Sequence, residues 1–200
     1  MKILRILTLT VLICFLALSV LPIHGEEAVY QKVIRLHVIA NSDSERDQQL
    51  KLAVRDAVLD LCAPRLSSCR TKEEAVEAVT EMEAEICATA EKTLAALGCD
   101  DAVTVTLSEE GYPEKRYESL CFPAGTYLSL RVQIGEAEGQ NWWCVLFPPL
   151  CLSAATKKEA EDAFVTVGFT PEQYRIITET DQPTYKIKFK FLELWEETFG

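Results

Sequence analysis

Alternating apolar and polar residues mark several short stretches of this 200-residue chain. A period of two places successive side chains on opposite faces of a sheet, so each stretch predicts a strand with one apolar face. The stretches cover residues 30–39, 103–107, 115–122, 128–134 and 142–147. Between the second and the third, the sequence Glu-Gly-Tyr-Pro at residues 110–113 is typical of a turn, because glycine and proline interrupt regular structure.

Two longer segments repeat their apolar residues every three or four positions, which predicts amphipathic helices. Ser42 with a glutamate three residues later is a capping box that opens the first helix, and Pro64 is expected to end it. Thr71 with a glutamate three residues later opens the second helix, and Gly98 is expected to cap its end. The stripe expected to be buried on the second helix comprises Ala75, Val79, Met82, Ile86, Ala90, Leu94 and Leu97.

The order of these elements predicts an α+β fold, with an antiparallel sheet and the two long N-terminal helices packed on one face. Short helices are expected over residues 157–164 and 171–177. Residues 185–191 alternate apolar side chains with lysines, which favours a strand that passes into a C-terminal helix. We divide the chain into a leader over residues 1–25, a domain over residues 26–155, and a C-terminal extension over residues 156–200 that packs on that domain.

The first residues have the pattern of an export signal. Lys2 and Arg5 precede an uncharged, mostly apolar run over residues 6–23. A basic flank followed by an apolar run is typical of a signal peptide, and this run is near the shortest length that spans a bilayer. We therefore expect the chain to be exported and either released by cleavage or tethered by a signal anchor. Membrane contact is expected only through this segment.

Acidic residues outnumber basic ones by 31 to 20, which gives a formal net charge of −11 at pH 7. Such a chain is repelled by phosphate backbones, so nucleic acid is not expected as a partner. The chain has two histidines and no pair of cysteines separated by two residues. Neither a metal site nor another cofactor is therefore expected.

Seven of the eight cysteines lie beyond the leader, and export makes disulfides permissible. Two pairs share the same spacing, Cys62 with Cys69 and Cys144 with Cys151. Closing such a short loop would stabilise the fold by roughly 2–3 kcal/mol. Because seven is an odd number, at least one thiol is free, and the spacing alone does not settle the pairing.

Residues 141–151 have an unusual composition, with two of the three tryptophans, two cysteines and a Pro-Pro pair. Pro148 and Pro149 lack the N–H that a central strand donates, so this part is not expected inside a sheet. Trp142 and Trp143 each carry a large apolar area. The segment is either a corner of the core or a rigid contact surface, and it contains no nucleophile–base pair.

His37 is the only histidine beyond the leader, so it is the sole candidate for a general base or a pH sensor. A nucleophilic site would pair it with Cys144 or Cys121 and orient it with Asn41. This alternative would make the chain a secreted hydrolase acting on peptide or cell-wall bonds. In the simpler interpretation His37 is structural and residues 41–44 form an N-cap turn. A purely structural component of the cell envelope is a third alternative.

Several motifs together resemble the stage II sporulation protein R family, over roughly residues 30–152. They are His-Val-Ile-Ala-Asn-Ser-Asp at residues 37–43, Val-Arg-Asp at 54–56, Phe-Pro-Ala-Gly at 122–125, Tyr-Leu-Ser-Leu-Arg-Val at 127–132, and the whole of 141–151. The last of these motifs is the most specific, and the export signal agrees with the resemblance.

The resemblance implies an exported signal rather than an enzyme, with no catalytic residue of its own. Such proteins are made in the forespore and act in the space between its two membranes. There they activate a membrane-embedded aspartic protease of the mother cell, which processes pro-sigma-E. The residues that we expect to contact this protease are His37, Asn41, Asp43, Tyr127, Arg131, Asn141, Trp142, Trp143, Pro148 and Pro149.

Overall fold

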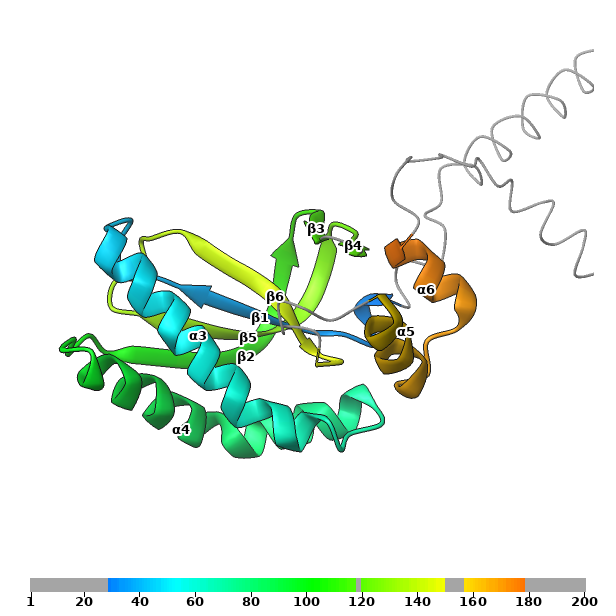
Figure 1. The fold of residues 1–200 in the computed structure, drawn as a ribbon, viewed down its shortest axis with the longest axis horizontal. Helices are drawn as coiled ribbons and strands as arrows, with labels where there is room; N and C mark the ends of the chain where they lie inside the picture. Colours follow the sequence, from blue (N-terminus) through cyan, green and yellow to red (C-terminus); the bar gives the residue numbers. More distant parts are fainter. Residues whose placement is uncertain (1–28, 118–119, 150–156, 179–200) are drawn as a thin grey trace, which may run out of the picture. The chain divides into compact units, whose positions relative to one another are not determined.

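A computed structural model of the chain describes residues 29–117, 120–149 and 157–178 (Figure 1). The leader predicted over residues 1–25 lies outside these ranges, and so do the strand predicted over residues 185–191 and the helix expected after it. Within the described ranges, no helix is long and apolar enough to cross a membrane.

Four strands form the central sheet, in the order β2–β5–β1–β6. Their bounds are Ile34–Ile39 for β1, Val103–Tyr112 for β2, Gly125–Ile134 for β5 and Asn141–Phe147 for β6. The β2–β5 and β1–β6 pairs are antiparallel, whereas β1 and β5 run parallel. The predicted α+β class is therefore confirmed, with one parallel strand pair that the sequence pattern did not indicate.

The predicted turn at residues 110–113 is wrong. Strand β2 continues through Gly111 to Tyr112, and β5 begins at Gly125 directly opposite Tyr112. Glycine and tyrosine here remain extended because every residue of β2 has a partner on β5. The longer strand places Glu110 on the sheet rather than in a loop.

The single strand predicted over residues 115–122 is also wrong. Two short strands, β3 (Lys115–Tyr117) and β4 (Leu120–Phe122), pair with each other as a separate antiparallel sheet. They lie against the side of the central sheet that faces away from the long helices (Figure 1).

The first long helix, α3, spans Glu45–Leu66. Its N-cap is Ser44, whose side chain accepts a hydrogen bond from the backbone N–H of Asp47, so the prediction of a cap at Ser42 is wrong. Ser42 instead donates to the Asp47 carboxylate and accepts from the Ser44 N–H. Pro64 lies inside the last turn, and the helix ends two residues after it.

The second long helix, α4, spans Lys72–Ala96 and has both of its predicted ends. The Thr71 hydroxyl accepts from the N–H of Glu74 at 3.2 Å. Gly98 adopts a φ of +71°, a left-handed conformation that glycine takes without strain and that is common just beyond a helix. The predicted buried stripe is confirmed except at Leu97, which follows the last helical residue and is 51% exposed.

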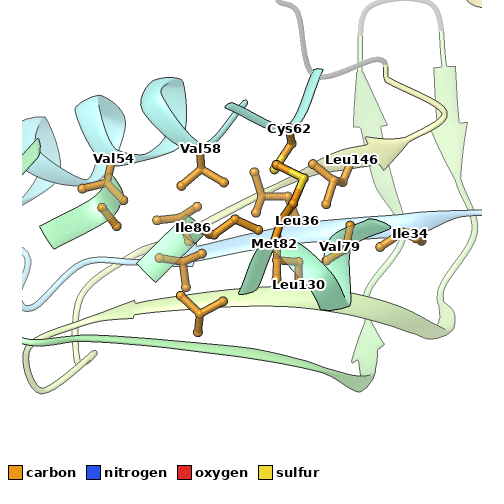
Figure 2. Close-up of a cluster of buried hydrophobic side chains, with 14 of the residues drawn as sticks. Ile34, Leu36, Val54, Val58, Cys62, Val79, Met82, Ile86, Leu130 and Leu146 are labelled. Carbon is orange, nitrogen blue, oxygen red and sulfur yellow. The ribbon is translucent and has the colours of Figure 1, made fainter. Parts of the chain in front are cut away.

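The first core lies between the two long helices and the sheet (Figure 2). Alternate residues of β1, namely Ile34, Leu36 and Val38, point toward the helices and are completely buried. Each fully buried aliphatic side chain of this size contributes about 1.5–3 kcal/mol to folding. Residues that meet them include Val54, Val58, Val79, Ile86, Leu130 and Leu146.

A second core lies around β3, β4 and two short helices near the end of the described chain. These helices, α5 (Lys157–Thr166) and α6 (Pro171–Thr178), confirm the helices predicted over residues 157–164 and 171–177. Phe164 and Ile177 are completely buried there, and the Phe164 ring meets the Phe122 ring of β4 at 6.2 Å between centroids.

Candidate functional site

The sheet face opposite α3 and α4 carries a row of polar and aromatic side chains, which we call the open face. Cross-strand register places Thr106, Arg131, His37 and Trp143 side by side on β2, β5, β1 and β6. We define the open face as Thr104, Thr106, Arg131, Gln133, His37, Asn141 and Trp143. All of these except His37 are partly or fully exposed.

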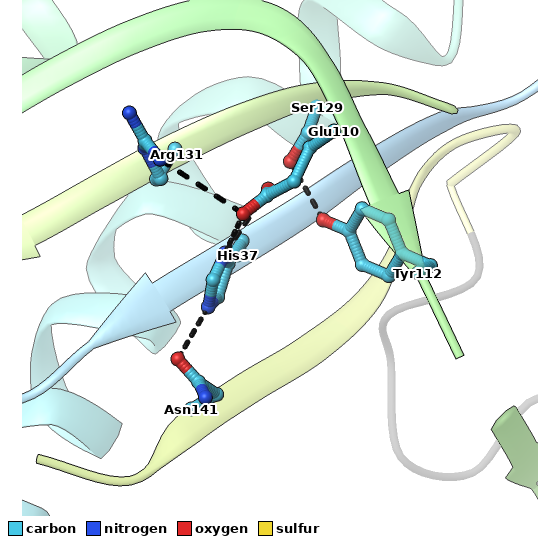
Figure 3. A network of polar contacts seen from close by, with 6 residues as sticks. All are labelled: His37, Glu110, Tyr112, Ser129, Arg131 and Asn141. Atoms are coloured by element: carbon cyan, nitrogen blue, oxygen red, sulfur yellow. Dashed lines mark hydrogen bonds and ion pairs between the residues drawn. The ribbon is translucent and has the colours of Figure 1, made fainter. Parts of the chain in front are cut away.

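His37 is the centre of a hydrogen-bonded network on this face (Figure 3). Its Nδ1 lies 2.9 Å from Oε1 and 3.0 Å from Oε2 of Glu110, and its Nε2 lies 2.7 Å from Oδ1 of Asn141. The ring is only 5% exposed. Because β2, β1 and β6 each supply one member, the network requires the complete sheet.

The partners of His37 decide what its ring can do. The Glu110 carboxylate only accepts hydrogen bonds, so Nδ1 of His37 donates to it, and Nε2 lies within hydrogen-bond distance of the Asn141 side-chain amide. Both ring nitrogens are therefore engaged by side chains of the sheet, and neither is free to contact a substrate. A general base needs a free acceptor nitrogen within hydrogen-bond reach of its substrate. The arrangement fits a fixed, recognition-type histidine better than a base.

Arg131 borders this network without being bonded into it. Its Nη1 lies 4.0 Å from Oε1 of Glu110, at the outer limit of an ion pair. Its Nε is buried and has no hydrogen-bond partner in the described part of the chain, and neither has the hydroxyl of Thr106, its cross-strand neighbour. The side chain as a whole is more than a third exposed. Arg131 thus presents unsatisfied donors beside an exposed surface.

Arg35 lies two residues before His37 on the same face, but inside the second core, where it is completely buried. Rings of Tyr112, Tyr117, Phe122 and Tyr127 surround its guanidinium carbon at 4.7–5.9 Å from their centroids. Its Nη2 donates to the Tyr117 hydroxyl at 2.9 Å, while Nε and Nη1 have no partner among the described residues. A buried charge without a carboxylate is costly, although cation–π contacts offset part of that cost.

Tyr117 links this buried arginine to the edge of the sheet. Its hydroxyl accepts from Arg35 and donates to the backbone carbonyl of Trp143, also at 2.9 Å. Burial raises the pKa of Tyr117, and the nearby Arg35 charge lowers it by a smaller amount. The hydroxyl therefore keeps its proton and can donate to Trp143.

The two tryptophans of the 141–151 segment point to opposite faces of the sheet, because they are neighbours on β6. Trp143 lies on the open face, with its ring 5.6 Å from the His37 ring and Lys115 Nζ 5.2 Å above it. Trp142 lies on the helix side, where the guanidinium of Arg55 on α3 stacks 4.4 Å from its ring. Trp142 is 37% exposed, so β6 presents apolar surface on both sides.

Asn41 and Asp43 hold the loop between β5 and β6. The Asn41 side-chain oxygen accepts from the N–H of Glu136, and Asp43 accepts from the N–H of Gln140. A Cβ at Gly139 would lie 2.3 Å from the Ser42 carbonyl oxygen, so glycine is required there. These contacts fix the loop just before Asn141, and thereby the residue that meets His37.

The remaining predicted contact residues differ in exposure. Tyr127 is buried and donates from its hydroxyl to the Pro123 carbonyl at 2.8 Å. Pro148 is buried, and Pro149 is partly exposed. Both prolines follow the end of β6, as their missing N–H groups predict.

The cysteines do not support the predicted nucleophile. Cys144 pairs with Leu36 across β1–β6 and points into the first core, on the face opposite His37. Cys62 and Cys69 were candidates for a disulfide, and both are free thiols. Cys144 is not among the free thiols, but Cys151 lies outside the described residues, so that bridge stays a prediction.

Sequence reasoning identified His37, Arg131, Asn141 and Trp143 but missed their connections. The sequence pattern places Glu110 in a turn and does not single out Arg35 or Tyr117. Strand β1 is buried on both faces, and Arg35 is a charged residue at an alternate position within it. That pattern is the signal that could have identified Arg35. No comparable signal in the sequence indicates that Glu110 meets His37, because 73 residues separate them.

The fold and the site define a two-layer α+β protein with a histidine-centred polar network on the sheet face that its long helices leave open. The profile of the stage II sporulation protein R family matches residues 30–157, which is most of the described chain. The chain belongs to this family, and the family gives it a role in sporulation.

One curated relative is the stage II sporulation protein R of Bacillus subtilis (strain 168), with 38% identity over 135 residues. The match covers 66% of this chain and 60% of the relative, so the chain spans less than two thirds of that protein's length. No solved structure gives a significant match.

Proposed function

We propose that this chain is an exported signalling protein that activates a membrane-embedded aspartic protease, and that this protease then processes pro-sigma-E. The observation that carries the proposal is membership of the stage II sporulation protein R family over the whole sheet and both long helices. By this proposal the chain leaves the forespore and acts in the space between its two membranes. It works by binding and performs no chemistry itself.

Two features of the site support a binding role. Strand β6 is an edge of the sheet and carries two tryptophans, one exposed and one half-buried. Tryptophan dominates the energetics of protein interfaces, and a rigid strand loses little conformational freedom on binding. A trigger must bind the active form of the protease more tightly than the inactive form, and a fixed surface allows such discrimination.

The alternative of a secreted Cys–His hydrolase has no supporting observation among the described residues. Both nitrogens of His37 are occupied by Glu110 and Asn141, and Cys144 lies on the other face of the sheet. To use His37 and Cys144 as a catalytic pair, the chain would have to break the hydrogen bonds of His37 and move the Cys144 side chain to the other face of the sheet.

The proposal is tested by adding the full chain to vesicles that contain the protease and pro-sigma-E. We expect cleavage only when all three are present. Replacing Trp142 and Trp143 together by alanine should abolish cleavage, whereas Leu97→Ala, which removes an exposed apolar side chain just beyond the end of α4, should not. If no cleavage occurs with the wild-type chain, the proposal is wrong, and a structural envelope role becomes the better explanation.

A further inference from the structure

The open face is locally basic in a chain that is strongly acidic overall. Arg131 lies on the face and Lys115 lies above Trp143. The one carboxylate among the described residues that reaches this site, Glu110, is already hydrogen-bonded to His37 through both oxygens. Beneath the same face, Arg35 adds a third positive charge that no described carboxylate pairs.

The charge of the rest of the chain does not cancel this local excess. The net charge of −11 is spread over the molecule, and much of it lies on the outer side of α4. At physiological salt the Debye length is about 8 Å, so distant exposed charges act weakly on a group bound at the open face. A group that touches Arg131 is governed by the side chains around it.

The donors left unsatisfied on this face have a defined chemistry. Arg131 makes no hydrogen bond to any described residue, and neither its buried Nε nor the buried hydroxyl of its cross-strand neighbour Thr106 has a partner there. The Arg131 side chain is 37% exposed, and its terminal N–H groups have no hydrogen-bond partner among the described residues, so they are the donors that an incoming acceptor can reach. The planar guanidinium is suited to a carboxylate, which it binds through two parallel N–H bonds.

An apolar site lies within reach of the same ligand. Trp143 is two strands away from Arg131, a separation of about 10 Å at the usual strand spacing. A peptide in the extended polyproline II conformation advances about 3.1 Å per residue and returns to the same side every third residue, so residues three apart cover that distance and both face the sheet. The ring of Trp143 is partly exposed and lies against His37 and Lys115.

We propose that the open face binds an acidic, extended segment of the partner protein, with a carboxylate on Arg131 and an apolar side chain about three residues away on Trp143. This inference rests on the proposed function in taking the partner to be the activated protease. A protein segment fits better than a small carboxylate, because the two anchoring points lie far apart on an exposed sheet face.

The test uses fluorescence anisotropy of a labelled nine-residue peptide and the full chain in non-ionic detergent. In this peptide a leucine follows each glutamate three residues later. A matched control peptide has glutamine in place of glutamate. We expect the glutamate peptide to bind at least about tenfold more tightly, with an affinity that falls as salt is raised.

Three variants separate the site from general charge. Arg131→Gln should weaken binding of the glutamate peptide about tenfold, and Arg131→Lys should recover only part of the loss. Arg65→Gln makes the same change in net charge at an exposed arginine near the end of α3, and it should have no effect. Unfolding curves of the variants show whether each remains folded.

Several outcomes would overturn the inference. They are equal affinity for the glutamate and glutamine peptides, no binding at millimolar peptide, or an unchanged affinity in folded Arg131→Gln. Inorganic phosphate is also tested as a competitor at matched ionic strength. If it displaces the peptide at concentrations as low as those of the peptide, the open face is a general anion site instead. Peptide binding without cleavage of pro-sigma-E contradicts the proposed function alone, and cleavage without peptide binding contradicts this inference alone.

Discussion

The two faces of the central sheet are built from different chemistry. The face toward α3 and α4 is aliphatic, completely buried and free of charged groups among the β1 residues that point to it. The other face carries Arg35, His37, Glu110 and Arg131, and among the described residues the buried side-chain polar atoms without partners lie on it. The stability of the fold therefore comes from the face that the helices cover. The open face retains charged and polar side chains that selection for stability alone would not favour.

The largest expected effect is on the helix-covered face. Ile86→Ala on α4 should lower the free energy of unfolding by about 2–5 kcal/mol, because a completely buried side chain leaves a cavity. Leu97→Ala, on the exposed end of the same helix, should change it by less than about 0.5 kcal/mol. Urea denaturation measures both, and a similar loss for the two variants would contradict the assignment of the first core.

High pH should weaken the same core through one thiol. Burial, with a smaller effect of Glu85, raises the pKa of Cys62 from 9.0 to about 12. Below pH 9 both states keep the proton. Between pH 9 and 12 the unfolded chain loses it and the folded chain does not, so stability should fall by up to about 1.4 kcal/mol per pH unit.

Cys62→Ala isolates this contribution. Its unfolding free energy should fall less steeply above pH 9 than that of the wild type, measured by denaturant titration at each pH. Identical slopes for the two proteins would show that Cys62 does not account for the loss.

Arg35→Met should behave in the opposite way to the core variant. The free energy of unfolding should stay within about 1 kcal/mol of wild type or rise, because the variant removes a buried charge that lacks a carboxylate. Denaturant unfolding gives the value. A loss of more than about 2 kcal/mol would mean that the four surrounding rings and Tyr117 already compensate the charge fully.

The smallest expected effect concerns the His37 network. Glu110→Gln replaces a charge-assisted hydrogen bond by a neutral one and should cost about 1 kcal/mol. Glu109→Gln changes the adjacent, exposed residue of the same strand and should cost less than about 0.5 kcal/mol. Equal costs, compared by thermal unfolding, would show that the contact with His37 contributes nothing.

Much of the fold follows from local pattern. Periodicity predicted both long helices, and Thr71 and Gly98 marked the ends of α4 through the backbone groups that they satisfy. The parallel pairing of β1 with β5 could not be predicted this way, because alternation shows which face is buried but not which strand lies alongside. The turn predicted at Glu-Gly-Tyr-Pro does not form, because the local preference of these residues for a turn is weaker than the continuous strand pairing between β2 and β5.

The candidate site could be predicted only in part. His37 and Trp143 were found because histidine and tryptophan are rare in this chain. Their neighbours Glu110 and Lys115 come from segments far along the sequence, and only the sheet register brings them together. Trp142 and Trp143 were expected to form one surface, but the alternation within a strand places them on opposite faces.

The most direct test of the account is the rate of pro-sigma-E cleavage in vesicles with two charge-matched variants. We predict that Arg131→Gln, on the open face, lowers the rate at least about tenfold, and that Arg65→Gln, on the helix side, leaves it unchanged. Both variants should have the wild-type free energy of unfolding to within about 1 kcal/mol. Equal cleavage rates for the two folded variants would contradict the claim that the open face is the docking surface.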